Sequence, residues 1–274
     1  MTEFQGPRES VVLDELSALL RFPFRGKAGQ NRFLVGSALL LGGMFVPILP
    51  AILVYGYLVR LMRGVMRGEP AELPAWELWG ELFIDGLKAM VVAFAYLLPG
   101  ILSMLAGFVA YFLAGPLSIA MMSAGRSGSD ASPALLLGLL GGMAIMLLGM
   151  SLGFFLSFLG TVPLPAALAR FVESGRLGDA FHLRALWRLI RAQGWRYFAA
   201  WVVVMGLIGT AYILYTLIYF TWILCAVGMV FIAPAMFYVL SIGAVIFGRF
   251  YAQYATPAAR VAADSSEIES DPAV

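Results

Sequence analysis

Apolar residues along this chain form long runs without a charged side chain, and polar residues gather between the runs. Four intervals lack Asp, Glu, Lys, Arg and His, and they cover residues 33–59, 89–125, 131–169 and 197–248. A helix needs about 20 apolar residues to cross the roughly 30 Å hydrocarbon core, so the last interval is long enough for two helices. The pattern predicts five apolar helical segments, at about 33–59, 87–123, 134–162, 197–224 and 227–249.

The composition supports this interpretation, because 61% of the residues are hydrophobic and only 12% are charged, whereas soluble domains have about 25% charged residues. The predicted fold class is all-α, a polytopic membrane helical bundle over residues 33–250. Residues 1–32 form a polar and amphipathic segment before it. Residues 251–274 are too polar to bury a core, and we expect them to be disordered.

An internal two-fold repeat is visible at a separation of 108 residues. Trp79 precedes Gly86 by seven positions, as Trp187 precedes Gly194, and each copy leads into an apolar segment. Such repeats indicate a duplicated architecture. In transporters, matched helix interruptions in two halves mark a solute site.

A candidate site for a lipid-like or neutral amphiphilic solute follows from the prolines before each copy and from a tyrosine row in the fourth segment. The alternative is that the prolines end helices at the membrane boundary and that the tyrosines pack between helices. The candidate residues are Pro47, Pro50, Pro163, Pro165, Tyr212, Tyr215 and Tyr219.

Two amphipathic helices are predicted at the membrane surface, at about 75–87 and 179–194, the second with Asp179 as its N-cap. The first is acidic and the second is basic. Either the basic helix binds anionic lipid headgroups while the acidic one faces a partner, or the two helices pair side by side. The candidate headgroup and interfacial residues are Trp79, Trp187, Arg184, Arg188 and Arg191.

Small residues recur on one side of the third segment at spacings of 4, 7, 4 and 7. Such a face lets two helix backbones approach closely, either within the bundle or in a homodimer. The residues are Gly138, Gly142, Gly149, Gly153 and Gly160.

The orientation follows from the basic residues, which concentrate on the cytoplasmic side. The repeat loops and the C-terminal part hold 12 of them, and the loop between the second and third segments holds only Arg126. If residues 33–59 cross once, the split is 12 to 6, and if they form a re-entrant hairpin it is 17 to 1. We expect a multi-pass protein of the cell membrane, with the repeat loops and the C-terminus cytoplasmic.

Catalytic and metal-binding residue sets are sparse. The chain has one histidine, His182, and one cysteine, Cys225, which excludes the common His- and Cys-based zinc sets and a Ser-His-Asp triad. We expect no enzymatic activity, no metal, no cofactor and no nucleic-acid partner.

A motif string then gives a family resemblance, and it covers roughly residues 20–250. The chain resembles the prokaryotic membrane proteins grouped as domain of unknown function 4013, although members often place Asp where this chain has Glu77-Leu78. The resemblance implies a polytopic membrane protein and supplies no activity, substrate or site residues. The motifs that carry it are Pro23-Phe24, Gly56-Tyr57, Gly68-Glu69, Leu73-Pro74 with Trp76 and Trp79, Asp85-Gly86 and Tyr96-Leu97-Leu98-Pro99.

These observations favour a non-enzymatic membrane scaffold or partner subunit. A carrier of an amphiphilic solute is the alternative. The expected partners are the lipid bilayer, including anionic lipids, and either a second copy of the chain or another membrane protein.

Overall fold

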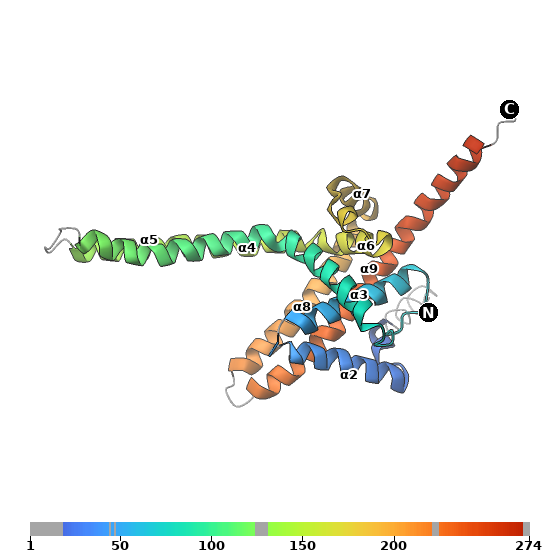
Figure 1. Cartoon of the computed structure of the whole chain (residues 1–274), viewed down its shortest axis with the longest axis horizontal. Coiled ribbons are helices and arrows are strands. Elements are labelled where there is room, and N and C mark those ends of the chain that lie inside the picture. Colours follow the sequence, from blue (N-terminus) through green and yellow to red (C-terminus); the bar gives the residue numbers. More distant parts are fainter. Residues whose placement is uncertain (1–18, 44, 47, 124–130, 221–224, 271–274) are drawn as a thin grey trace, which may run out of the picture. The chain divides into compact units, whose positions relative to one another are not determined.

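The computed structural model describes residues 19–43, 45–46, 48–123, 131–220 and 225–270, and in these residues the regular structure is helical throughout (Figure 1). The elements are η1 (Phe22–Phe24), α2 (Gly26–Gly42), α3 (Ile48–Met66), α4 (Trp79–Ser123), α5 (Ala131–Thr161), α6 (Leu164–Ser174), η2 (Leu177–Phe181), α7 (Leu183–Gln193), α8 (Trp195–Phe220) and α9 (Cys225–Ser270).

Among the described residues, five helical stretches are long and apolar enough to cross a membrane, which confirms the helical class and agrees with the predicted number of apolar segments. The first is Ile48–Met66, so it begins and ends later than the predicted segment 33–59. The other four are Trp79–Pro116, Leu136–Thr161, Trp195–Ile218 and Val230–Gln253.

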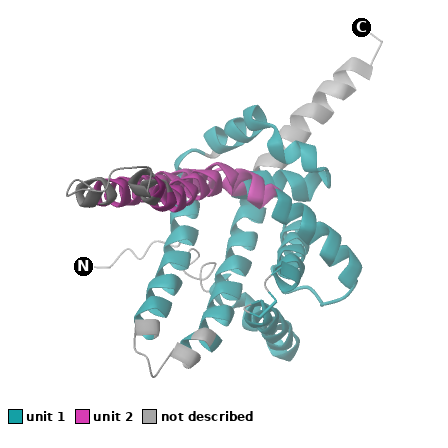
Figure 2. Ribbon diagram, turned by 60° about the vertical axis from the view of Figure 1, so that its left-hand side comes forward, with its two compact units in different colours: residues 1–91, 165–274 teal, residues 92–164 magenta. Residues whose placement is uncertain are grey.

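The chain divides into two compact units (Figure 2). One unit contains residues 92–164, and the other contains residues 1–91 and 165–274. In the larger unit, α9 packs against α2, α3 and α8. Its core gathers around Tyr57 of α3 and Phe237 of α9, both fully buried.

The smaller unit is a hairpin of α4 and α5 joined by closely packed small residues. The Ser103 hydroxyl donates to the carbonyl of Gly149 over 3.1 Å, and a Cβ added at Gly107 would press on the backbone of α5. The outer side chains stay uncovered, since Phe112 is 68% exposed and Leu148 is 70% exposed. These exposed apolar faces require an apolar solvent.

The glycine stripe of α5 faces α4 of the same chain, as expected for packing within the bundle. A Cβ at any of four of these glycines would meet atoms of α4. Gly142 lies against Ala114, Gly149 against Gly107, Gly153 against Met104 and Gly160 against Tyr96. Gly138 is half-buried and lies in the same helix.

Residues 33–59 form parts of two helices, with α2 ending at Gly42 and α3 beginning at Ile48. The Arg32 guanidinium in α2 donates to the carbonyl of Leu73, in the loop after α3, and the Trp76 indole donates to the carbonyl of Arg32. The start of α2 therefore lies beside the end of α3, and the two helices run antiparallel. An antiparallel pair of this kind is the arrangement that the re-entrant alternative requires.

The loop ends of three helices meet elsewhere in the larger unit. A cavity of about 420 Å³ is lined by Arg67 at the end of α3, by Glu173 and Gly175 at the end of α6, and by Tyr251 of α9. The Tyr251 hydroxyl donates to the Glu173 carboxylate. The loops that follow α3 and α6 thus start on the same side of this unit, together with the distal part of α9.

Three local expectations differ from the structure. Residues 75–87 are not a separate helix, because α4 begins at Trp79 and continues unbroken through the second apolar segment. Asp179 lies inside η2, and the N-cap of α7 is His182, because the 3-10 turn delays the start of the helix. Residues 251–270, assigned to a disordered tail, continue α9 to Ser270; the Ala-rich stretch there has high helix propensity.

The antiparallel hairpin predicts that the start of α2 and the repeat loops are accessible from the same side of the membrane. In a Cys225→Ala background, Lys27→Cys and Arg176→Cys should react with an impermeant maleimide in inside-out vesicles only. Phe45→Cys, at the tip of the hairpin and 85% exposed, should not react from that side. Reaction of Lys27→Cys and Arg176→Cys from opposite sides would contradict the hairpin.

Candidate functional site

Tyr57 is the centre of a cluster that holds the loop between α3 and α4. Its side chain is fully buried, and its hydroxyl donates to the carbonyl of Pro74 over 2.8 Å. Its ring stacks on Trp76 with centroids 3.9 Å apart, and Trp76 in turn stacks on Trp79 at 5.7 Å. Together with the two hydrogen bonds between Arg32 and the loop, these contacts fix residues 73–79 against α2 and α3.

The crossing of α3 and α4 beside this cluster brings the two backbones into contact. A Cβ at Gly56 would overlap the backbone of Leu82, and a Cβ at Gly86 would overlap the carbonyl oxygen of Ile52. Only glycine allows this approach. Gly56 and Gly86 thus act as a pair, one on each helix.

Acidic side chains of α4 pair with arginines of α3 immediately beyond the crossing. The Asp85 carboxylate lies 2.9 Å from the Arg63 guanidinium, and the Glu81 carboxylate lies 3.4 Å from that of Arg60. Arg60 also donates to the backbone carbonyl of Glu77 over 2.8 Å. Glu77, Glu81 and Asp85 form the acidic stripe of the helix predicted at 75–87, which we expected to face a partner or the basic helix. Arginines of α3 neutralise this stripe in part.

The loop between α3 and α4 carries three further carboxylates, which we call the acidic platform: Glu69, Glu72 and Glu77. All three residues are exposed. Among the described residues, none of their carboxylates forms an ion pair. The backbone beneath them is fixed, since the N–H of Glu69 donates to the carbonyl of Gly64 over 3.1 Å.

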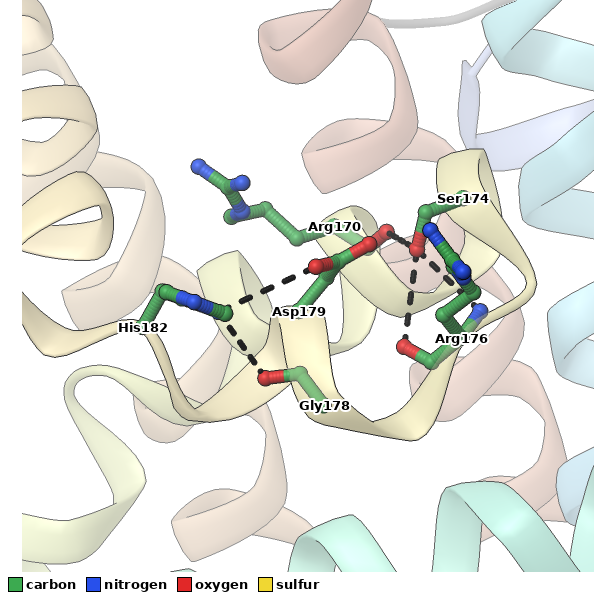
Figure 3. A network of polar contacts seen from close by, with 6 residues as sticks. All are labelled: Arg170, Ser174, Arg176, Gly178, Asp179 and His182. Carbon is green, nitrogen blue, oxygen red and sulfur yellow. Dashed lines mark hydrogen bonds and ion pairs between the residues drawn. The ribbon is translucent and has the colours of Figure 1, made fainter.

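The connection from α6 to α7 is shaped by local polar contacts (Figure 3). The Ser174 hydroxyl lies 3.0 Å from the carbonyl of Arg170 and accepts from the backbone N–H of Arg176 at 3.2 Å. A ring nitrogen of His182 lies 3.0 Å from the carbonyl of Gly178 and 3.8 Å from the Asp179 carboxylate. These contacts set the direction in which α7 leaves the loop.

The basic helix α7 presents three different faces. Leu186 and Leu189 are buried in the larger unit, at 1% and 3% exposure. Leu183 and Trp187 are exposed apolar residues on the neighbouring side. The next side carries three exposed arginines, Arg184, Arg188 and Arg191.

Comparison with known proteins gives one match. The family model described as "Protein of unknown function (DUF4013)" matches residues 39–220. This span is about two thirds of the chain. The chain belongs to the DUF4013 family. No curated protein and no solved structure matches the chain.

The DUF4013 match contains most of the cluster just described. It begins near the end of α2 and covers α3, the loop, α4 and α7. Arg32 and Phe237, which pack on the loop from α2 and α9, lie outside it. Some of the motifs that carried the resemblance lie close together in the larger unit, because Gly56, Tyr57, Pro74, Trp76 and Gly86 contribute to the cluster or to the crossing beside it.

The described candidate solute-site residues of this DUF4013 protein lie on α3, α6 and α8 and in the turn before α6. Pro50 and Pro165 lie in the first turns of α3 and α6, where proline is tolerated because those N–H groups have no helical partner. Pro163 lies in the turn before α6, and Pro47 lies outside the described residues. Tyr212 is 62% exposed and its ring lies 6.3 Å from that of Tyr215. The side chain of Tyr219 lies outside the described part.

Sequence reasoning missed Arg60 and Arg63 as the partners of the acidic stripe. Their spacing places them on one face of a helix, as it does for Glu81 and Asp85, which was the available signal. The sequence did not show that α3 packs against this stripe, because that contact depends on the crossing at Gly56 and Gly86. In the described part of the chain, no group of three His, Cys, Asp or Glu residues could hold a metal ion.

The glycine crossing predicts a position-specific loss of stability. Gly86→Ala should lower the free energy of unfolding by about 1 to 3 kcal/mol, because the added methyl forces α3 and α4 apart. Gly206→Ala in α8 is the matched control, since a Cβ there meets no atom within 4 Å. Thermal unfolding in one detergent compares them, and equal melting temperatures for the two variants would refute the crossing.

Proposed function

We propose that this protein is a non-enzymatic membrane scaffold or partner subunit of the cell membrane, with its repeat loops and C-terminus in the cytoplasm. Its core would anchor a structured loop, and the loop would present charge to a partner. The observation that carries the proposal is the acidic platform on a loop whose backbone is tied to α2 and α3.

The order of the loop matters for binding. A partner that docks on the platform would not have to order a flexible segment, which lowers the entropic cost of association. Glu69, Glu72 and Glu77 would favour a partner with a basic surface, because charge complementarity speeds encounter and rejects wrong partners. Tyr57 and Trp76 support this role by holding the loop rather than by facing a ligand.

The two copies of the predicted repeat differ in structure, which supports a different binding role for each. In the first copy, two acidic residues pair with α3 and the remaining carboxylates face outward. In the second copy, Gly194 has a φ of 51° and ends α7, so a separate basic helix forms before α8. We infer that a duplicated segment has given rise to one protein-facing loop and one basic helix.

The carrier alternative would place a solute at breaks in the membrane helices. Pro50 and Pro165 lie in the first turns of α3 and α6, so neither proline breaks the helix that contains it. This position favours the scaffold over the carrier.

Site-specific cross-linking tests the scaffold role. A photoreactive residue at Glu72 should give a discrete protein adduct in native membranes, and the same adduct should form from Glu77. Placement at Leu148, an exposed apolar position in the smaller unit, is the control and should give no such band. Neutralising the other two platform residues to Gln should reduce the adduct at least about threefold.

Two outcomes would overturn the proposal. One is a cross-linking pattern at Glu72 that is the same as at Leu148. The other is a stoichiometric solute on the purified chain, found by native mass spectrometry, which would favour the carrier. An adduct with twice the mass of the chain would identify the partner as a second copy.

A further inference from the structure

The position of α7 relative to the bilayer follows from its connection to α8. Only Gly194 separates the end of α7 from Trp195, the first residue of a helix that is long and apolar enough to cross a membrane. The end of α7 therefore lies where a membrane span begins. The exposed residues near the end of α7 therefore lie close to the level at which α8 would enter the membrane.

The rotation of α7 about its axis is also determined. Leu186 and Leu189 are held in the core of the larger unit, so α7 has little freedom to turn. This leaves Leu183 at 65% exposure and Trp187 at 54% exposure on the side next to the arginines. Apolar residues beside a row of arginines are typical of a helix lying in a membrane interface.

The arginines of α7 have charge available for an external ligand. The described acidic residues that form ion pairs do so with Arg60, Arg63 and His182. Within the described part of the chain, Arg184 and Arg188 form no ion pair, and Arg191 lies over the ring of Trp187 at 5.2 Å. An arginine stacked on an interfacial tryptophan keeps its guanidinium hydrogens free for phosphate.

Exposed aromatic residues also flank α7 along the chain. Phe181 precedes the helix, and Trp195 and Phe198 follow it, with exposures of 42%, 77% and 43%. Such residues concentrate at the level of lipid headgroups. A water-soluble acidic partner would match the arginines and leave these rings uncovered, whereas a lipid surface matches both.

We propose that α7 is an anionic-lipid-binding helix that lies in the interface of the leaflet from which α8 enters the membrane. Arg184, Arg188 and Arg191 bind lipid phosphates, while Leu183 and Trp187 enter the acyl region. The helix thereby makes the packing of the cytoplasmic face depend on the lipid composition of that leaflet. This surface is distinct from the acidic platform, so it stands or falls separately from the scaffold role.

Depth-dependent quenching in reconstituted vesicles tests the proposal on the full chain. A bimane label is attached to Leu183→Cys in a Cys225→Ala background, and quenching by acyl-brominated phosphatidylcholine is measured. With about one third phosphatidylglycerol in the vesicle, quenching should be about twofold stronger than in phosphatidylcholine alone. High salt should weaken this difference, because it screens the attraction between arginine and lipid.

Charge variants separate the role of α7 from a general effect of positive charge. The triple change Arg184→Gln, Arg188→Gln and Arg191→Gln should abolish the dependence on phosphatidylglycerol. The control removes the same charge elsewhere, by Arg25→Gln, Arg67→Gln and Arg176→Gln at exposed positions, and should retain it. Quenching that is equal in both vesicle types, or a dependence that survives in the α7 triple variant, would overturn the proposal.

Discussion

The close crossing of α3 and α4 at Gly56 and Gly86 is the constraint on which the rest of the larger unit depends. Because the backbones touch there, the residues one and two turns beyond Gly56 meet those just before Gly86 on α4. The contact between the two helices therefore limits the conformations that the loop between them can adopt. It packs over Tyr57, where the stack with Trp76 and the hydrogen bonds to Arg32 hold it in place.

The crossing also determines how the charges of this face are distributed. Arg60 and Arg63 form ion pairs with Glu81 and Asp85 of α4. The arginines of α7 are therefore not needed to neutralise these two carboxylates. What remains is an acidic loop surface and a basic helix beside a membrane span. Opposite charges in the two copies are therefore compatible with two separate partners, a protein for one and lipid phosphate for the other.

The features that depend on composition and on periodicity within one helix could be predicted from the sequence. Charge-free runs gave the helical class and the number of spans, and the motif string gave the family. The spacing of Gly149 and Gly153 indicated a close helix contact, and both glycines lie against α4.

The features that depend on tertiary contacts could not be predicted. The charge count favoured a hairpin over residues 33–59 and the helix lengths opposed it, and neither showed that Arg32 of α2 contacts Leu73 in the loop after α3. Gly86 and Gly194 hold the same place in the repeat predicted from the sequence, yet Gly86 lies inside a helix that α3 contacts, whereas Gly194 has a positive φ and ends a helix. A repeat pattern alone does not contain that difference.

The most direct test of this account is a charge swap between α3 and α4. Asp85→Arg should lower the melting temperature in detergent, because it places two like charges beside each other at the crossing. Adding Arg63→Asp should recover at least about half of that loss, whereas adding Arg188→Asp should recover none. Recovery by Arg188→Asp and not by Arg63→Asp would show that the acidic stripe pairs with the basic helix, which would contradict the account.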